Sequence, residues 1–298
     1  IHGSPTCELV YKNAKAELCG ERKLGLIKYV MALMNGARLG IAAQSVGLSQ
    51  AAYDEALAYA KDRKQFGKAI IEFPAVYDML ATIKAKLDAG RALLYQTSRY
   101  VDIYKALDDI ARERKLTPEE RQEQKRYAKL ADSFTPLAKG MNSEYANQNA
   151  YDCIQVHGGS GFMMEYACQR IYRDARITSI YEGTTQLQTV AAIRYVTNGS
   201  YAATLHEYEM IPCAPEFEGY MNRKLEACTN AVKEAQNQEL LDLVSRRLYE
   251  MAAVCVMSHL LLQDATKAPD MFGKSLNVYV NYAESEVEKH FNFIRKFQ

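Results

Sequence analysis

The sequence predicts an all-α protein, and two patterns carry that prediction. Apolar residues recur at intervals of three, four and seven over long stretches, which is the period of an amphipathic helix. Proline and glycine are scarce inside these stretches, so little interrupts them. We expect a short β-like segment within residues 1–20, a four-helix up-and-down bundle over residues 21–198, and a second helical extension over residues 199–298.

The first long helix is expected within residues 24–62. Its second half is rich in small side chains, which let neighbouring helices approach closely. These small residues are Gly40, Ala42, Ala43, Ser45, Gly47, Ser49, Ala51 and Ala52. We therefore place this helix in the crowded interior of the bundle, after a β-like start at about residues 5–19.

The next two helices have recognisable first turns. Pro74 suits the first turn of one helix, and apolar residues follow it at helical spacing. The other helix begins with the pattern of a capping box: Thr117 suits its N-cap, Pro118 its first position and Glu120 its third position. The charged residues 105–126 are interpreted as a solvated helical excursion. We expect a bend or a break at Pro136.

Later boundaries follow glycines and capping residues. The third helix should stop at the Gly-rich turn 157–161, and another should span about 165–180. Thr185 and Gln188, three apart, predict a further helix start. Residues 199–218 contain two prolines and are expected to form a linker, after which apolar residues mark a bundle helix. The residues that mark it are Leu241, Val244, Leu248, Met251 and Cys255.

Composition excludes several classes of protein. The 37 basic and 36 acidic residues leave a formal charge of +1, so we expect no nucleic-acid partner. No apolar run reaches the roughly 18 residues that a membrane span needs. The seven cysteines are scattered without a C-x-x-C pair or nearby histidines at zinc spacing, which predicts reduced thiols and no metal site. We expect a soluble, cytoplasmic protein.

Three turns between long helices could carry chemistry. In Arg-Lys-Gln-Phe-Gly at 63–67, a planar guanidinium suits a pyrophosphate, but a basic helix end that complements the dipole explains the charges as well. In Gln-Val-His-Gly-Gly-Ser-Gly at 155–161, glycines let backbone N–H groups approach a phosphate or adenine, yet they also serve as a plain helix stop. His157 alone is interpreted as a packed or capping side chain.

The third turn contains Glu182, which precedes a predicted helix. A carboxylate in an apolar pocket can act as a general base, whereas a carboxylate before a helix start is also favoured by the helix dipole. Spacing alone does not separate these two readings.

Taken together and in order, four segments resemble the C-terminal half of the acyl-CoA dehydrogenases, flavoenzymes that desaturate acyl-CoA thioesters. They are Arg-Leu-Gly-Ile-Ala-Ala-Gln-Ser-Val-Gly (38–47), Asp-Arg-Lys-Gln-Phe-Gly-Lys (62–68), Gln-Val-His-Gly-Gly-Ser-Gly-Phe (155–162) and Tyr-Arg-Asp-Ala-Arg-Ile-Thr-Ser-Ile-Tyr-Glu-Gly-Thr-Thr-Gln-Leu-Gln (172–188). The resemblance covers roughly residues 1–197.

The resemblance implies a base and a cofactor. A glutamate in the Tyr-Glu-Gly-Thr motif removes the α-proton of the thioester while a hydride leaves the β-carbon for flavin N5, and here that residue is Glu182. Some members carry the base at the position of Ala37, which cannot ionise. The resemblance also implies residues near the acyl-CoA, which are Asn35, Arg38, Tyr181 and Gly183. It implies contacts with an FAD held mainly by a neighbouring subunit, made by Arg63, Gln65 and Phe66, with Gln155, Gly158 and Gly159 near the adenosine end of that FAD. Two further residues that follow the base would contact FAD: Thr184 and Gln186.

The resemblance also implies an electron-transfer flavoprotein as partner and a homodimer or homotetramer. The family carries an N-terminal helical domain and a middle β-domain, and this sequence resembles a fragment that starts in the last strand of the latter. We therefore expect an incomplete FAD site and weak or absent activity of the fragment alone.

The extension could cover a neighbouring subunit, fill the place of another subunit pair, or be an exposed appendage. One rival function is a non-catalytic helical interaction module. The other is that of the DNA-associated branch of the superfamily, and the acidic extension argues against this second rival. Acyl chain length stays open.

Overall fold

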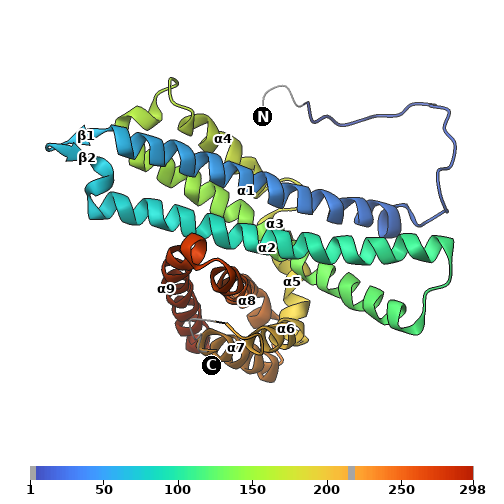
Figure 1. Cartoon of the computed structure of the whole chain (residues 1–298). Coiled ribbons are helices and arrows are strands. Elements are labelled where there is room, and N and C mark those ends of the chain that lie inside the picture. Colours follow the sequence, from blue (N-terminus) through green and yellow to red (C-terminus); the bar gives the residue numbers. More distant parts are fainter. Residues whose placement is uncertain (1–4, 214–218, 298) are drawn as a thin grey trace.

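Three long helices form the body of the protein. The computed structural model describes residues 5–213 and 219–297. Helices α1 (Met31–Asp62), α2 (Pro74–Glu113) and α3 (Pro118–His157) lie side by side along the molecule (Figure 1). The π-helical turn η1 (Gly25–Val30) leads into α1. The predicted all-α class is confirmed.

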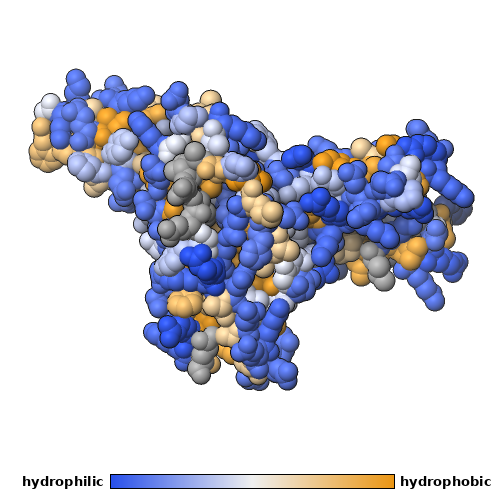
Figure 2. All heavy atoms as spheres, turned by 60° about the horizontal axis from the view of Figure 1, so that its bottom comes forward, coloured by the Kyte–Doolittle hydropathy of each residue, from blue (hydrophilic) through white to orange (hydrophobic). Residues whose placement is uncertain are grey.

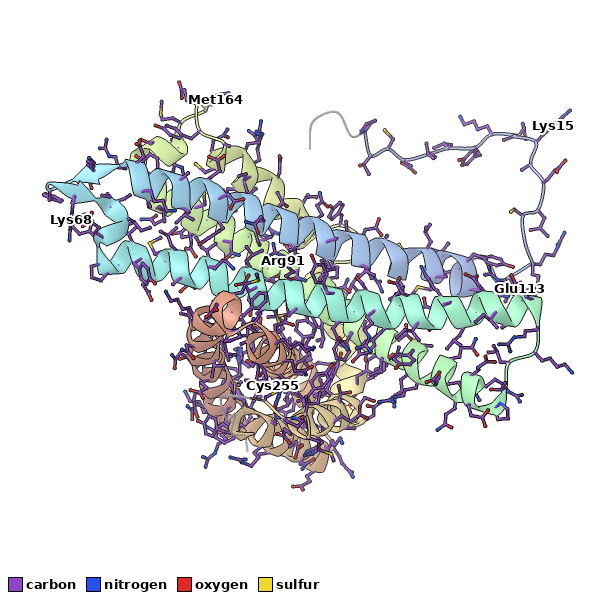
Figure 3. The ribbon with its side chains drawn as sticks, viewed as in Figure 1. Lys15, Lys68, Arg91, Glu113, Met164 and Cys255 are labelled. Atoms are coloured by element: carbon purple, nitrogen blue, oxygen red, sulfur yellow. The ribbon has the colours of Figure 1, made fainter. Side chains whose placement is uncertain are left out.

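Shorter elements complete the bundle at one end. Helix α1 is joined to α2 by a short hairpin and a 3-10 turn. The hairpin has two strands of two residues each, β1 (Lys64–Gln65) and β2 (Lys68–Ala69), and the turn is η2 (Ile70–Glu72). The 3-10 turn η3 (Gly158–Phe162) follows α3, and α4 (Cys168–Thr178) packs back on α1 and α3 as the fourth helix. Figure 3 places Lys68 and Met164 at this end of the molecule.

The extension is a second helical unit below the bundle in Figure 1. Helix α5 (Thr185–Thr197) leads into it, and α6 (Ser200–Glu209), α7 (Tyr220–Ala235), α8 (Gln238–Lys267) and α9 (Pro269–Ile294) form it, followed by the short turn η4 (Arg295–Phe297). Helix α8 is central: its residues 251–262 are all buried.

Local sequence signals account for several boundaries. The Thr117 hydroxyl accepts a hydrogen bond from the Glu120 N–H at 3.2 Å, and the Glu120 carboxylate accepts one from the Thr117 N–H at 2.9 Å. The predicted capping box is thus confirmed, as is the start of α2 at Pro74. The small residues of α1 lie in the interior only in part: Ala42, Ser45, Ser49 and Ala52 are buried, whereas Gly40, Ala43 and Gly47 are exposed on the opposite side of the helix.

Three expectations need correction. Residues 5–24 contain no strand among the described residues; they lie apart from the bundle, where Figure 3 shows Lys15, because an isolated extended segment has no neighbouring strand to satisfy its backbone. Helix α3 runs through Pro136 without the expected break, since packing on both sides outweighs one lost backbone hydrogen bond; the alternative of a bend at Pro136 stays a prediction. The predicted linker contains α6, although Pro215 lies outside the described residues.

The extension is docked on the bundle rather than appended to it. Residues of α2, α3 and all four extension helices share one continuous hydrophobic core, and a second core lies at the hairpin end. Among the described residues, five hydrogen bonds of buried side chains cross the junction. Three join two side chains: Tyr100–Tyr208 (3.0 Å), Tyr145–Tyr279 (2.9 Å) and Ser275 to Asp88 (2.6 Å). Two end on a backbone carbonyl: Tyr201 to Ser133 (2.6 Å) and Tyr249 to Pro136 (3.0 Å). The reading as an exposed appendage is therefore wrong.

The surface is largely hydrophilic on the face that carries the extension. Figure 2 shows the extension projecting from the long bundle there, with hydrophobic residues only in scattered patches. Among the described residues, none of the helices combines the length and apolarity that a membrane crossing requires. All seven cysteines are free thiols.

Candidate active site

The turn between α4 and α5 has a strained backbone. Glu182 has φ 54° and Gly183 has φ 92°, so two consecutive residues lie in the left-handed region. A residue with a side chain pays roughly 1–2 kcal/mol there. Such a conformation persists only where surrounding groups hold it.

Three donors from three helices hold this turn through its two carbonyl oxygens. Lys139 of α3 donates to the Gly183 carbonyl at 2.6 Å, and Arg38 of α1 donates to the Glu182 carbonyl at 3.3 Å. The Gln188 amide of α5 donates to both carbonyls, at 3.4 and 3.1 Å. These hydrogen bonds hold the backbone from which the Glu182 side chain projects.

The Glu182 carboxylate is partly enclosed. Its Oε2 atom is buried and has no hydrogen-bond partner among the described residues. Beside it, the Tyr181 hydroxyl donates to the Gln44 side chain of α1. A buried carboxylate oxygen without a donor is costly unless a ligand or another chain completes the site, and such an oxygen can accept a proton.

Lys139 is a buried cation in this region. Burial lowers its pKa to about 8, and the nearby Arg38 charge acts in the same direction, whereas Glu144 and Glu182 favour the protonated form. No sequence pattern marks this residue, because a lysine in a helix is normally solvated.

The start of α5 lies directly after the turn. Thr184 is its N-cap, and its hydroxyl accepts a hydrogen bond from the Leu187 N–H at 3.4 Å, so the cap lies one residue before the predicted one. Thr185 instead donates to Glu144 at 2.6 Å. Gln186 is exposed. The positive end of the α5 dipole therefore faces the turn.

Asn35 and Arg38 lie together on α1, as their spacing predicts. Arg38 Nη1 donates to Asn35 Oδ1 at 3.2 Å, and Asn35 donates to Asp132 at 3.3 Å. Asn35 also lines a hollow of about 380 Å³ between α1, α2, α3 and α5. Its other walls include Tyr104, Lys105, Lys129, Thr135 and Tyr195.

A second hollow, of about 550 Å³, lies at the hairpin end. Two segments far apart in sequence meet in it, and the predicted residues that line it are Arg63, Gln65, Phe66, Gln155, Gly158 and Gly159. Tyr59 completes it: its ring stacks on His157 at 4.3 Å, and its hydroxyl donates to Ser160 at 3.2 Å. Tyr59 was missed, and its position one turn before Arg63 was the available signal.

The two regions lie at opposite ends of α1. About 25 helical residues separate Arg38 from Arg63, which is roughly 38 Å along the axis. The structure thus brings the predicted residues together in two groups, one around Glu182 and one around Arg63, and not in a single site.

A buried cluster below the Gly-rich turn has metal-ligand residue types. The ligand atoms of Cys153, His157 and Cys168 all lie within 4.8 Å of one another. Burial raises the pKa of both thiols, which opposes the thiolate that a metal needs, and a structural zinc requires four ligands. His157 Nδ1 is 2.8 Å from the Cys153 carbonyl oxygen. We interpret this cluster as packing that supports the turn, as expected for a packed histidine.

Comparison with known proteins identifies the family. The family model described as "Acyl-CoA dehydrogenase, C-terminal domain" matches residues 27–195, and the one described as "Acyl-CoA dehydrogenase C terminal" matches residues 197–298. The probable acyl-CoA dehydrogenase FadE25 of Mycobacterium tuberculosis is 35% identical over 197 residues, which are 65% of this chain and 44% of that protein. The caffeyl-CoA reductase-Etf complex subunit CarC of Acetobacterium woodii is 35% identical over 190 residues, 62% of this chain and 43% of that one.

A solved structure has the same fold. The acyl-CoA dehydrogenase of Bacillus anthracis complexed with FAD superposes with a TM-score of 0.70 at 21% identity, over 89% of this chain and 49% of that one. The chain spans less than half the length of each of these three proteins. One family model alone covers more than half of the chain, and the fold agrees: the chain belongs to the acyl-CoA dehydrogenase family.

Proposed function

We propose that the protein containing this chain is an FAD-dependent acyl-CoA dehydrogenase in which Glu182 is the catalytic base. The observation that carries the proposal is the buried Oε2 of Glu182, which has no hydrogen-bond partner in the described part of the chain and sits on a turn held by three donors. This carboxylate takes the proton from the α-carbon of the thioester. FAD, when bound, supplies the acceptor for the hydride that leaves the β-carbon.

The residues of this chain would orient the substrate. Asn35 and Arg38 lie on the same side of α1 as the turn, and Arg38 contacts both Asn35 and the Glu182 backbone. Tyr181 and Gly183 flank the base. We propose that the acyl-CoA lies along this face, with the hollow beside Asn35 receiving part of it.

The hollow at the hairpin end fits part of FAD. Arg63 offers a guanidinium for a pyrophosphate, and the backbone of Gly158 and Gly159 is open, since a Cβ added to either would meet no atom within 4 Å. Because this hollow is roughly 38 Å from Arg38 along α1, the FAD that it contacts would react beside the Glu182 of another subunit. We therefore propose at least a homodimer, with Thr184 and Gln186 on the FAD of their own subunit, and weak or absent activity of this chain alone.

The electron acceptor and the reaction direction are part of the proposal. A relative is named as a subunit of a reductase-Etf complex, which supports an electron-transfer flavoprotein as partner. The same name shows that relatives include reductases, and in that direction Glu182 would return the proton to the α-carbon. Both directions should therefore be assayed.

The test is Glu182→Gln in the full-length protein. We expect thioester-dependent reduction of the flavin to be lost while the protein retains FAD, because the amide cannot accept the proton. Glu123→Gln is the control, since Glu123 is exposed in the charged excursion. Normal turnover by Glu182→Gln would disprove the assignment. Absence of flavin reduction in the wild type with any thioester would favour the non-catalytic helical module.

A further inference from the structure

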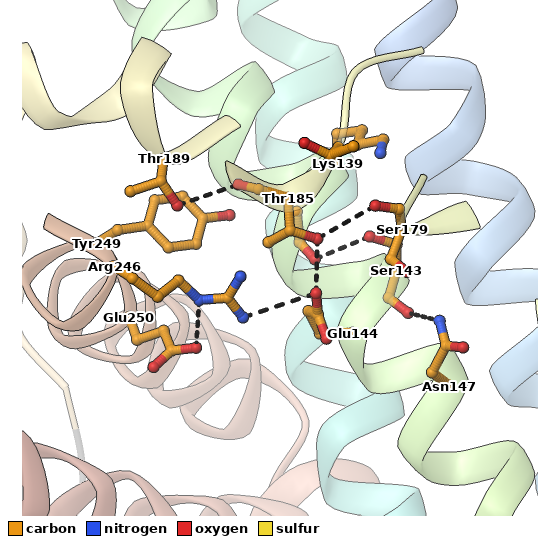
Figure 4. A network of polar contacts seen from close by, with 12 residues as sticks. Lys139, Ser143, Glu144, Asn147, Ser179, Thr185, Thr189, Arg246, Tyr249 and Glu250 are labelled. Atoms are coloured by element: carbon orange, nitrogen blue, oxygen red, sulfur yellow. Dashed lines mark hydrogen bonds and ion pairs between the residues drawn. The ribbon is translucent and has the colours of Figure 1, made fainter. Parts of the chain in front are cut away.

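A chain of polar contacts links the extension to the turn that carries Glu182. Arg246 of α8 lies 3.6 Å from Glu144 of α3, measured from Nη2 to Oε1, and its Nε donates to Glu250 at 2.6 Å. The same Glu144 oxygen accepts the 2.6 Å hydrogen bond from the Thr185 hydroxyl. Figure 4 shows this path from α8 to the start of α5.

Thr185 closes the turn. It is the first residue of α5, three positions after Glu182, and its N–H donates to the Ser179 carbonyl at 3.1 Å. This hydrogen bond joins the two ends of the segment 179–185. The contact chain from Arg246 therefore ends on the residue that sets the closure of the turn.

A second contact supports the same region. Tyr249, nearly one turn after Arg246 on α8, is fully buried and donates to the Pro136 carbonyl at 3.0 Å. A Cβ added to Gly140 would lie 2.0 Å from the Tyr249 hydroxyl oxygen and 3.4 Å from Gln188 Cβ. The Gly140 backbone is thus held between the extension and Gln188, whose amide binds both carbonyls of the turn.

We propose that the C-terminal extension positions the base: Arg246, acting through Glu144 and Thr185, fixes the turn that holds Glu182. The catalytic consequence rests on the proposed function, whereas the effect on the turn does not. Arg246 is a positioning residue, because it contacts Glu144, Glu250 and the Tyr249 ring, and none of the contacts among the described residues joins it to the base itself. The extension thus contributes to the active site by positioning the base, in addition to burying the surface of the bundle that it contacts.

The experiment compares Arg246→Met with Arg247→Met. Arg247 is the adjacent arginine on α8, and its guanidinium lies 3.5 Å from the ring centroid of Phe293, inside the extension. Hydrogen exchange of peptides covering 179–189 is measured in this chain and in the full-length protein. We expect faster exchange there in Arg246→Met only, with Arg246→Lys intermediate because it keeps the charge.

Kinetics in the full-length protein separate positioning from folding. We expect kcat to fall roughly tenfold in Arg246→Met, with KM for the thioester within about twofold, because a displaced base affects the chemical step. Thr185→Val should lower kcat similarly, and the double variant should be no worse than either single variant, since both break one path. Arg247→Met should keep the wild-type kcat.

The outcomes are distinct. Equal exchange and equal kcat in the Arg246 and Arg247 variants would overturn the proposal, and so would additive effects of Arg246→Met and Thr185→Val. Faster exchange at 179–189 only in Arg246→Met, in a protein whose wild type reduces no flavin, would support the positioning role and count against the proposed function alone.

Discussion

Lys139 and Gly183, 44 positions apart, are joined by a 2.6 Å hydrogen bond from the buried ammonium group to the peptide carbonyl. Through this contact the Lys139 ammonium group of α3 lies against the turn that carries Glu182. Burying a charge is costly, and here the cost appears as a pKa of Lys139 lowered to about 8. A partly desolvated cation is thus the group that holds the Gly183 carbonyl of this turn.

This lysine should make stability depend on pH. Its pKa of about 8 in the folded state lies below the 10.5 of an ordinary lysine, so between these values the unfolded chain binds more protons than the folded one. The contribution of Lys139 to the free energy of unfolding therefore rises with pH, by roughly 2 kcal/mol between pH 7.5 and 10.

Urea unfolding of wild type and Lys139→Met at the two pH values measures this. We expect the wild type to gain stability relative to the variant at the higher pH. Lys61→Met, which changes an exposed lysine at the end of α1, should show no such trend. A Lys139→Met difference that stays constant with pH would contradict the prediction.

Sequence signals were sufficient where the cause of structure is local. Pro74 and the Thr117–Glu120 box set helix starts from neighbouring atoms alone, and both are confirmed. The α6 helix was missed because the prolines after it suggested a linker. The β-like start failed for a different reason: a strand depends on a partner strand, which no local pattern reveals.

The candidate site shows the same difference between features set by local sequence and features set by packing of distant segments. Glu182 and the residues of the hairpin-end hollow were recognised as separate segments, but only the fold shows that 63–66 and 155–159 meet and that Glu182 lies far from them. Lys139 and Arg246 were not identified. Their burial and contacts result from the packing of α3 against α5 and α8, and neither residue type nor spacing distinguishes them from solvated cations.

Gly140 should be essential for docking of the extension. In Gly140→Ala the new Cβ would lie 2.0 Å from the Tyr249 hydroxyl oxygen, so α8 must shift or the core must open. We expect a loss of about 1–3 kcal/mol of unfolding free energy. Gly140→Ala combined with Tyr249→Phe should recover part of it, because the closest atom is then absent.

Gly47→Ala is the control for this substitution. A Cβ at Gly47 in α1 would meet no atom within 4 Å, so the change should stabilise the helix by up to about 1 kcal/mol. Chemical denaturation of the four proteins gives the comparison. The steric account fails if Gly140→Ala behaves like Gly47→Ala.

The hairpin-end hollow should contribute to FAD retention. Arg63→Gln removes the guanidinium that lines the hollow, and we expect the full-length protein to lose FAD at least tenfold more readily on dilution or gel filtration. Lys64→Gln removes the same charge from the adjacent position, which does not line the hollow. Equal flavin loss in both variants would show that general charge, and not this hollow, holds the cofactor.

Gly183 should be required for activity beyond its effect on stability. Its φ of 92° disfavours any side chain, and an added Cβ would lie 2.9 Å from Gln188 Nε2, the donor to both carbonyls of the turn. Gly199, with φ 78°, has the same backbone preference but would meet no atom within 4 Å. Alanine at either position should therefore cost about 1 kcal/mol of stability from backbone strain.

Only Gly183→Ala should also displace Gln188 and the base. We therefore expect kcat for flavin reduction to fall by roughly two orders of magnitude in that variant and to stay within twofold in Gly199→Ala. Parallel measurement of urea midpoints and flavin reduction separates the two effects. If both variants lost activity in proportion to their stability, the donors on the turn would have no role in placing Glu182.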